Sequence, residues 1–453
     1  MMIPSRYNIT IPDYPKAGGI LIFNTLSGSL YELEPDYRKS LESLQNGSDL
    51  DESDMVRLTE MAEEGYVVED EETEKDMVIH NIRAAAYGNS PVVKATVVTT
   101  MACNLACKYC FESGMEKSPT MDRETAQLVF DQIVKRAQDP SVKAIDIDYY
   151  GGEPLLNMDI IRFLSKKFQE WCEENKKTYG FTMTTNGTLL TPEVVERLKP
   201  LGFQGARITI DGVREIHDAR RPYKNGKGFS FDTIMKNLTN TVDMLPITLV
   251  NVCSKESIRQ LPSLLDELEE KQILDKLAAF QPGIEQPYLD KKGSVCGTMD
   301  CALTKESAEN FLLAVQELFR RNLPARGELL QGTNCSITAA HGLLIFNADG
   351  KMYKCPVLMD KPEFSVGHVS QEKLNKHHFT CVTKEIWKKE CLDDTDCPYV
   401  PTCGAGAGCR FAALVNSGDL WGDGCSREFH DHYVPEVMKL EHMKKYEVNS
   451  SKA

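Results

Sequence analysis

The sequence predicts an α/β protein of two or three domains, built around a parallel sheet that is open or closes toward a barrel. Two observations support this fold class. Within residues 86–327, six runs of β-branched and apolar residues alternate with helical patterns, which indicates parallel strands joined by right-handed crossovers. The 453-residue chain also exceeds the usual size of one domain, and its 42% apolar residues suffice for more than one core.

The first 85 residues predict a small module of their own. The segments "GILIFN" and "SLYEL" form a hairpin about a Leu-Ser-Gly turn, and a short helix follows. A second helix, "ESDMVRLTEMAEEG", ends near Gly65, and "YVVED" is expected to form a wing strand. This order of elements is similar to a winged helix. The acidic run "VEDEETEKD" beyond it is interpreted as a solvated linker.

The barrel region is justified strand by strand. Its expected strands are "VVKATVVTT", "AIDIDYYGGEP", "FTMTTNGTLL", "ARITIDG", "ITLVNVCS" and "LAAFQPGIE". Helical patterns separate them, among them "DRETAQLVFDQIVKRA", "MDIIRFLSKKFQEWCEENKK" and "TPEVVERLKPLG". The last of these begins with Thr191 as N-cap and Pro192 at the first helical position. The helix "ESAENFLLAVQELFRRN" ends the region.

Residues 328–453 contain few predicted regular elements and many thiols. The segment "HGLLIFNADGKMYKCPVL" predicts a hairpin about Asp349-Gly350, and "VPEVMKLEHMKKY" predicts a final amphipathic helix. Close-set cysteines lie between the two. We therefore expect metal to build much of this core.

Composition limits the class of partner. The formal net charge of -15 argues against binding to nucleic acid or to an anionic membrane. No segment has the pattern of a signal peptide and no apolar run is long enough to span a bilayer, so a cytoplasmic protein is expected. Because the cytosol keeps thiols reduced, 15 cysteines indicate metal binding more than a disulfide framework.

Three thiols follow the first barrel strand directly. Cys103, Cys107 and Cys110 lie where active sites of parallel α/β folds are found, at the carboxyl end of a strand. A closed zinc site needs a fourth ligand, and no fourth thiol is near. Three thiolates on a [4Fe-4S] cluster leave one iron open to a cofactor or substrate. The alternative is a redox or zinc site with its remaining ligand elsewhere in the chain.

The spacing Cys-x3-Cys-x-aromatic-Cys, with Tyr109 as the aromatic residue, resembles the radical S-adenosylmethionine (radical SAM) superfamily. The resemblance implies a partial (β/α)6 barrel similar to a TIM barrel. It also implies that Cys103, Cys107 and Cys110 hold a [4Fe-4S] cluster whose open iron is chelated by S-adenosylmethionine. Cleavage of this cofactor by one electron gives a 5'-deoxyadenosyl radical, which abstracts a hydrogen atom from the substrate.

The resemblance implies further cofactor contacts. The "GGEP" segment (Gly151, Gly152, Glu153 and Pro154) ends the second strand, where the backbone of the family contacts the methionine amino group. Glycines there permit close backbone approach.

Other cofactor candidates lie at the ends of later strands. Alternation places Thr182 and Thr184 on one face, as polar contacts to the cofactor or as threonines packed on a helix. Arg221 falls at the arginine that pairs with the methionine carboxylate in peptide- and sulfatase-modifying relatives, a task suited to guanidinium. Asn251 is a further candidate, whereas His217 would brace the loop.

Seven cysteines between Cys335 and Cys425 resemble the SPASM extension, which holds two auxiliary [4Fe-4S] clusters. By analogy, the distal cluster is bound by Cys391, Cys397, Cys403 and Cys425, and the nearer one by Cys335, Cys355 and Cys409. The second half departs from the family spacing, because five residues separate each of Cys391, Cys397, Cys403 and Cys409. A zinc tetrathiolate at these four is the alternative, but it leaves the other thiols unexplained.

The fourth ligand of the nearer cluster stays open. Either Cys296 or Cys301 supplies it, or an open iron binds a substrate thiolate beside the radical. Cys172 and Cys253 are interpreted as small buried apolar residues, and Cys381 has no assigned role.

These resemblances together imply a SPASM-type maturase of ribosomally synthesised, post-translationally modified peptides. The N-terminal module resembles a peptide-recognition element, in which a leader peptide adds a strand to a sheet edge, here near "GILIFN" or "SLYEL". A DNA-binding winged helix is disfavoured because the acidic helix would repel phosphate. The expected product is a thioether between a peptide Cys and a carbon, as in sactipeptides, and the expected reductant is a flavodoxin or ferredoxin.

Two other functions remain as alternatives. An anaerobic sulfatase-type maturase would oxidise Cys or Ser to formylglycine. A multi-cluster electron carrier would hold the iron without radical chemistry, although "GGEP" and Arg221 argue against it.

Overall fold

The fold is organised by one curved sheet of nine strands, in the order β11-β10-β9-β8-β7-β6-β14-β15-β16. The computed structural model describes residues 2–110, 112, 119–284, 288–289, 295–296, 304–323, 335–339, 342–359, 361–383, 389–393, 397–404 and 409–450. Six consecutive strands pair in parallel, as the sequence predicts. They are β6 (Val92–Thr100), β7 (Ala144–Gly151), β8 (Thr178–Thr185), β9 (Phe203–Thr209), β10 (Ile247–Cys253) and β11 (Ala279–Ile284).

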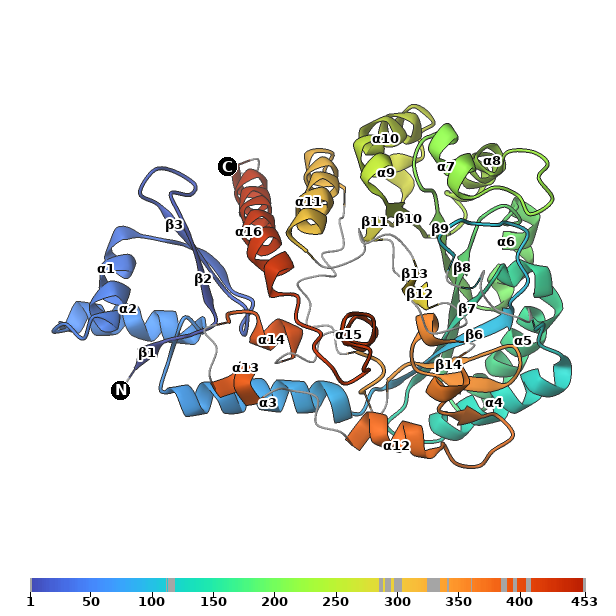
Figure 1. Cartoon of the computed structure of the whole chain (residues 1–453), viewed down its shortest axis with the longest axis horizontal. Coiled ribbons are helices and arrows are strands. Elements are labelled where there is room, and N and C mark those ends of the chain that lie inside the picture. The colour runs from blue at the N-terminus through green and yellow to red at the C-terminus, as the bar shows by residue number, and fades with distance from the viewer. Residues whose placement is uncertain are drawn as a thin grey trace.

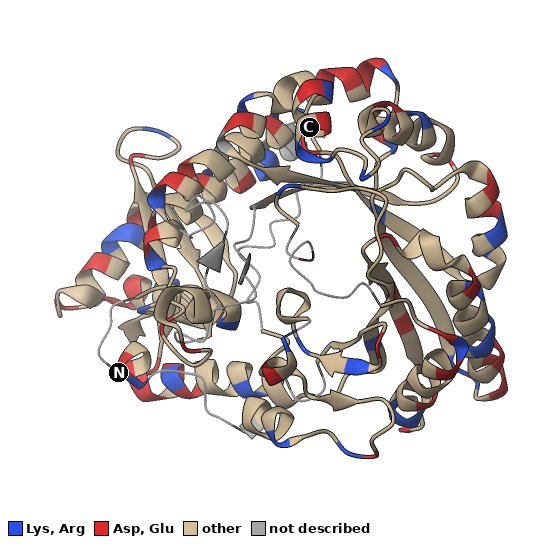
Figure 2. Ribbon diagram, turned by 45° about the vertical axis from the view of Figure 1, so that its right-hand side comes forward, with Lys and Arg blue, Asp and Glu red and all other residues tan. Residues whose placement is uncertain are grey.

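Helices cover the outer face of this sheet, and their exposed sides carry interspersed acidic and basic residues (Figures 1 and 2). They are α4 (Arg123–Ala137), α5 (Met158–Glu174), α6 (Pro192–Leu198), α7 (Arg214–Arg220), α8 (Ser230–Thr241), α9 (Lys255–Arg259), α10 (Leu261–Glu270) and α11 (Lys305–Arg320). Short 3-10 turns are η1 (Pro154–Asn157), η2 (Lys199–Leu201) and η3 (Leu274–Lys276). The mixed α/β architecture with a parallel sheet is that of a partial barrel.

The two faces of the sheet differ in chemistry. On β7, Ile145, Ile147 and Tyr149 belong to the apolar core shared with the outer helices. Asp146 and Asp148 alternate with them and therefore face the inside of the barrel. Strand β7 thus presents apolar side chains to the outer helices and carboxylates to the interior of the barrel.

The N-terminal module has a three-stranded antiparallel sheet, in the order β2-β3-β4. The elements are β1 (Ile3–Pro4), β2 (Asn8–Pro12), β3 (Ile20–Asn24), β4 (Leu30–Leu33), α1 (Pro35–Gln45), α2 (Glu52–Glu63), β5 (Val67–Val68) and α3 (Glu71–Tyr87). The "GILIFN" strand, β3, pairs on both sides, so its edges are occupied. This corrects the expectation that a peptide adds there, and leaves "SLYEL", which is β4.

The predicted acidic linker is instead the start of helix α3. Asp70 caps this helix by accepting a hydrogen bond from the Thr73 N–H at 2.8 Å. Acidic residues in the first turn suit the positive end of the helix dipole. Glu74 is 1% exposed and accepts a hydrogen bond from the Ser5 hydroxyl. A run of like charge therefore forms a helix here because its charges lie at the helix N-terminus.

The C-terminal region extends the barrel sheet. The predicted hairpin is β14 (Leu344–Phe346) and β15 (Lys351–Tyr353), which turn at Gly350 with φ +83°, and β14 pairs in parallel with β6. The expected boundary at residue 328 lies outside the described residues. The remaining elements are β12 (Tyr288–Leu289), β13 (Val295–Cys296), β16 (Gly367–His368), η5 (Pro356–Leu358), η6 (Pro362–Phe364), α12 (Lys376–Thr383), α13 (Lys389–Asp393), α14 (Val400–Cys403), α15 (Arg410–Ser417) and α16 (Arg427–Ser450).

The last helix contacts both the barrel region and the N-terminal module. Helix α16 packs beside α11 and against the β2-β3 face of the N-terminal sheet (Figure 1). The shared apolar cluster includes Ile11, Phe23, Phe311, Phe429 and Tyr433. Among the described residues, no helix has the length and apolar character needed to cross a membrane.

Candidate active site at the carboxyl end of the barrel

The thiol loop begins where β6 ends, and a neighbouring segment fixes it. The Ala106 N–H donates to the Pro222 carbonyl at 2.8 Å, and the Lys108 N–H donates to the Arg220 carbonyl at 3.0 Å. Leu105 forms an antiparallel bridge with Tyr223. The chain that follows α7 therefore holds the three cysteines over the carboxyl end of the barrel.

Cys103, Cys107 and Cys110 lie close enough for their charges to interact. Burial, reinforced by neighbouring negative charge, raises the pKa of Cys103 to about 11 and that of Cys110 to about 12. Thiolates in such a place need a positive partner, and cluster irons supply one. In the described part of the chain, no three His, Cys, Asp or Glu side chains are placed to share a single metal ion. A [4Fe-4S] cluster fits these thiols because it spreads its ligands over separate irons.

The two glycines of "GGEP" allow the end of β7 to pack closely against this loop. Gly151 has φ +150°, and a Cβ there would lie 2.1 Å from the Thr100 carbonyl oxygen. A Cβ on Gly152 would lie 2.5 Å from the Ala102 carbonyl oxygen. Backbone hydrogen bonds from residues 152 and 153 reach Thr100 and Ala102, each at 2.9 Å. Close approach to the thiol loop itself thus requires glycine.

Glu153 uses its side chain within the protein. The residue is 0% exposed, and its carboxylate accepts hydrogen bonds from the Thr185 hydroxyl at 2.8 Å and the Asn186 N–H at 2.8 Å. Burial raises the pKa of this carboxyl, and these hydrogen bonds oppose the shift. The Pro154 carbonyl accepts from the Thr99 hydroxyl at 3.2 Å. Both residues tie β7 to the neighbouring strand ends.

An asparagine pair beside the first thiol was not predicted from the sequence. Asn186 Nδ2 donates to Asn104 Oδ1 at 2.8 Å and lies 3.8 Å from Cys103 Sγ. Asn104 Nδ2 donates to the Thr188 hydroxyl at 2.9 Å. The only signal in the sequence is that Asn104 lies within the thiol loop and Asn186 within "TTNG".

Thr182 and Thr184 share one face of β8, as alternation predicts, and both face Asp148. Thr182 Oγ1 donates to Asp148 Oδ1 at 3.2 Å, and Thr184 Oγ1 donates to Oδ2 at 3.3 Å. Burial raises the pKa of Asp148 to about 6, although Arg207 opposes the shift. Arg207 donates to Gln281 Oε1 at 2.7 Å. The two threonines thus orient a carboxylate inside the barrel.

Tyr109 connects the thiol loop to two charged residues. Its hydroxyl donates to Asp211 Oδ2 at 2.6 Å and accepts from Arg221 Nη1 at 2.6 Å. The Arg220 guanidinium lies 4.7 Å from the centre of the Tyr109 ring. Arg221 is 7% exposed, lies near Cys107, and its buried Nε has no hydrogen-bond partner. A buried guanidinium with an unused donor fits the carboxylate of a cofactor.

His217 and Asn251 have internal partners. The Asp211 N–H donates to His217 Nδ1 at 3.2 Å, and burial lowers the pKa of this histidine to about 4, which keeps it neutral. Asn251 Nδ2 donates to the Ile210 carbonyl at 2.8 Å, while its Oδ1 accepts from the Cys253 thiol at 3.1 Å. The Nδ2 end of the Asn251 amide thus connects β10 to the chain that follows β9, while the Oδ1 end is used within β10 itself.

The C-terminal thiols lie in two groups. Electrostatic interactions join Cys335, Cys355 and Cys409 in one group. The other group contains Cys391, Cys397, Cys403 and Cys425. The Cys397 thiol interacts with that of Cys425, and it lies near the Tyr7 hydroxyl together with Cys403. Cys391 packs in the same apolar cluster as Cys397. Cys301 and the side chain of Cys296 lie outside the described residues.

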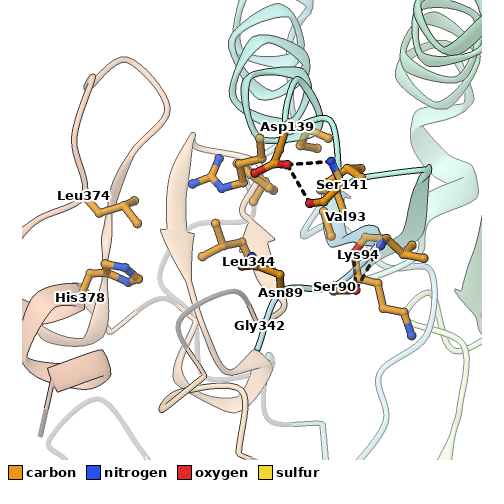
Figure 3. Close-up of a pocket in the computed structure, with 16 residues that line it drawn as sticks. Asn89, Ser90, Val93, Lys94, Asp139, Ser141, Gly342, Leu344, Leu374 and His378 are labelled. Atoms are coloured by element: carbon orange, nitrogen blue, oxygen red, sulfur yellow. Dashed lines mark hydrogen bonds between the residues drawn. The ribbon is translucent and has the colours of Figure 1, made fainter. Parts of the chain in front are cut away.

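A well-formed cavity lies at the opposite end of the barrel (Figure 3). It measures about 150 Å³ and is lined by the start of β6, the start of β14 and residues such as Asp139, Ser141 and His378. Asp139 Oδ1 accepts from the Ser141 N–H at 2.8 Å. Because active sites of parallel barrels lie at the carboxyl ends of strands, this cavity is not the candidate active site.

Comparison with known proteins shows what the barrel region is similar to. Residues 97–268 match the family model of the radical SAM superfamily. The chain is 31% identical over 171 residues to the uncharacterised protein MJ0907 of Methanocaldococcus jannaschii, covering 37% of this chain and 56% of that protein. This chain therefore spans only about half the length of that relative. It is also 25% identical over 337 residues to the cysteine-type anaerobic sulfatase-maturating enzyme of Clostridium novyi, covering 68% of this chain and 85% of the enzyme.

A solved structure resembles nearly the whole chain. SuiB of Streptococcus suis, bound to its precursor peptide SuiA, matches with a TM-score of 0.54 and 15% identity, covering 94% of this chain and 99% of SuiB. This likeness shows the fold. Residues 97–268 are thus similar to the radical SAM superfamily, and the chain as a whole has a relative among the sulfatase-maturating enzymes.

Proposed function

We propose that the chain is a radical SAM peptide maturase that modifies a precursor peptide. The observation that carries the proposal is the thiol loop, which lies at the carboxyl end of β6 against the Tyr109–Asp211–Arg221 cluster. Residues 1–85 would recognise the peptide, 86–327 would perform the radical chemistry, and 328–453 would hold two auxiliary [4Fe-4S] clusters. SuiB, which the chain resembles over its length, was solved with its precursor peptide.

The proposed roles at the active site follow from the donors present. Cys103, Cys107 and Cys110 would hold a [4Fe-4S] cluster, and Arg221 would pair with the carboxylate of S-adenosylmethionine beside residues 151–154. When bound, this cofactor pair supplies a 5'-deoxyadenosyl radical that removes a hydrogen atom from the substrate. Tyr109 and Asp211 hold the Arg221 guanidinium in place.

The leader peptide would add as a strand to the outer edge of β4. This strand pairs with β3 alone within the described sheet, so its other edge has unpaired backbone groups. Tyr31, in the middle of β4, is 47% exposed and is available to a peptide side chain.

The proposed product is a thioether between a peptide Cys and a carbon of an acceptor residue. Forming this bond removes two hydrogens from the peptide. The hydrogen atom of the carbon would go to the 5'-deoxyadenosyl radical, while the thiol would lose a proton and the one remaining electron would pass to a bound [4Fe-4S] cluster. Formylglycine formation is a second candidate, because 68% of the chain aligns with an enzyme of the sulfatase-maturating class.

The test uses the reconstituted enzyme, S-adenosylmethionine, a chemical reductant and a candidate precursor peptide under anaerobic conditions. We expect 5'-deoxyadenosine together with a peptide that has lost two hydrogens and one free thiol. A peptide aldehyde that reacts with a hydrazide probe would indicate formylglycine instead. If the wild-type enzyme and the Cys107→Ala variant release the same amount of 5'-deoxyadenosine, the proposed function is wrong.

A further inference from the structure

We propose that Cys381 is the fourth protein ligand of the [4Fe-4S] site formed by Cys335, Cys355 and Cys409. The inference rests on the proposed function, which assigns auxiliary clusters to this part of the chain. Cys381 does not belong to the set of seven C-terminal cysteines whose spacing resembles the SPASM extension, and the sequence alone assigns it no role.

The four cysteines come from separate elements that meet at one place. Cys335 precedes a turn, Cys355 begins the η5 turn after β15, and Cys409 caps helix α15. Cys381 lies on helix α12 and is 1% exposed. The apolar cluster that includes Cys381 is the one against which Cys335 and Cys355 pack. Its other buried members are Ile337, Leu358, Phe411 and Leu420.

Electrostatic interactions and a shared cavity link Cys381 to this group. Cys381 lies close enough to Cys335 for their charges to interact, and Cys335 interacts in turn with Cys409. Cys355 and Cys381 line the same small cavity. Cys172 provides a contrast: it is equally buried, at 1% exposure, but packs among the apolar side chains of the barrel.

Buried positive charge surrounds the same group. Lys354 is 3% exposed, its ammonium donates to the Ala339 carbonyl, and the charged groups that act on it are the Cys381 and Cys335 thiols. Arg410 is 2% exposed and interacts with Cys335 and Cys409. A buried cation requires a nearby negative charge. Four thiolates on a cluster core of formal charge 2+ carry a net charge of about −2. Lys354 and Arg410 offset part of it, and Arg410 also interacts with Asp419 and Asp423.

A fourth thiolate completes the ligand set of the nearer auxiliary cluster, the one assigned to Cys335, Cys355 and Cys409. Each iron then has a protein ligand, and a substrate thiolate does not bind at this cluster. A thioether-forming reaction would have to hold its donor thiol by other contacts.

The test compares Cys381 with the equally buried Cys172 in full-length, anaerobically reconstituted protein. The Cys103→Ala, Cys107→Ala and Cys110→Ala changes are present in every sample, so that only the auxiliary sites contribute iron and electron paramagnetic resonance (EPR) signals. In Cys381→Ala we expect a loss of about one iron per chain and a [3Fe-4S] EPR signal on oxidation. In Cys172→Ala we expect neither change.

The near-isosteric Cys381→Ser variant distinguishes the loss of a ligand from a folding defect. An oxygen ligand should keep the iron but shift the EPR signal of one cluster, whereas a purely structural cysteine would leave the spectrum as it was. Wild-type iron content and spectra in Cys381→Ala would overturn the proposal. It would also fail if Cys296→Ala or Cys301→Ala, and not Cys381→Ala, produced the three-iron signal.

Failure of the Cys381 assignment can be distinguished from failure of the proposed function. If the background protein takes up no auxiliary iron at all, the Cys381 assignment is wrong and so are the auxiliary clusters. Cleavage of S-adenosylmethionine by the unmutated protein, measured in parallel, would still test the barrel site.

Discussion

At the residue scale, Tyr109 explains why an aromatic residue lies between the second and third thiols. Its hydroxyl is the common partner of Asp211 and Arg221, at 2.6 Å from each. Asp211 is 0% exposed, so this contact lies where solvent cannot replace it. The tyrosine therefore positions the guanidinium that would receive the cofactor carboxylate.

Replacing Tyr109 by Phe should slow cofactor cleavage. The change removes a hydrogen bond shared by two buried charged groups, so we expect the free energy of unfolding to fall by about 1–3 kcal/mol. Formation of 5'-deoxyadenosine should fall by about tenfold. Tyr149→Phe is the matched control, because its hydroxyl lies 3.0 Å from Ser165 Oγ in the outer core. The control should be less stable than the wild type but should cleave the cofactor at the wild-type rate. Equal rates of cleavage in the two variants would contradict the role of Tyr109.

Asp148 should make stability depend on pH. Burial raises its pKa in the folded state to about 6, above the value of about 3.9 in an unfolded chain. Between these values the folded state holds more protons, so the contribution of Asp148 to stability is complete below about pH 4 and is lost as pH rises toward 6. The free energy of unfolding should therefore fall by about 3 kcal/mol between these pH values, and Asp148→Asn should remove this decrease.

Urea unfolding of the iron-free chain at several pH values measures this effect. Asp139→Asn, on an exposed loop, is the control. If Asp148→Asn and the unsubstituted chain showed parallel pH profiles, the buried carboxylate would not be the cause.

At the scale of elements, the sequence predicts the six parallel strands because their β-branched runs are buried on one side and bounded by turns. It fails at "VEDEETEKD", where composition indicates a linker but an N-cap and the helix dipole produce α3. It also does not identify the central strand of the N-terminal sheet, because pairing partners depend on the folded chain. The Tyr109–Asp211 contact joins residues 102 positions apart, and no local pattern encodes it.

The outer edge of β4 gives a prediction at the same scale. The Asn24 N–H donates to the Ser29 carbonyl, so by alternation the backbone groups of Tyr31 face β3 and those of Glu32 face outward. Glu32→Pro should therefore remove an outward N–H while keeping the β3–β4 ladder, and weaken leader-peptide binding by about tenfold or more. Fluorescence anisotropy with a labelled leader peptide measures the affinity.

Thr10→Pro is the matched control on the other outer edge. Thr10 is an exposed residue of β2, and the same alternation directs its backbone groups away from β3. The control should bind the leader as tightly as the wild type. If Thr10→Pro weakened binding and Glu32→Pro did not, the peptide would add to β2.

At the scale of the whole molecule, the distal thiol group lies against the N-terminal module. Tyr7, Val78 and Ile82 share an apolar cluster with Leu392 and Val400, and Cys391 and Cys397 pack against it. Arg6 Nη1 donates to the Leu392 carbonyl at 2.7 Å, and Lys75 forms an ion pair with Asp393 at 3.2 Å. Segments from the two ends of the chain thus enclose the thiols proposed to hold the distal cluster.

The iron and acid-labile sulfide content of anaerobically reconstituted protein tests the central claim most directly. Three [4Fe-4S] clusters predict about twelve irons and about twelve sulfides per chain, and about eight of each when Cys103, Cys107 and Cys110 are replaced by Ala. About four irons, with zinc bound alongside, would contradict the auxiliary clusters. An iron content unchanged by replacing the three barrel cysteines would contradict the radical SAM site itself.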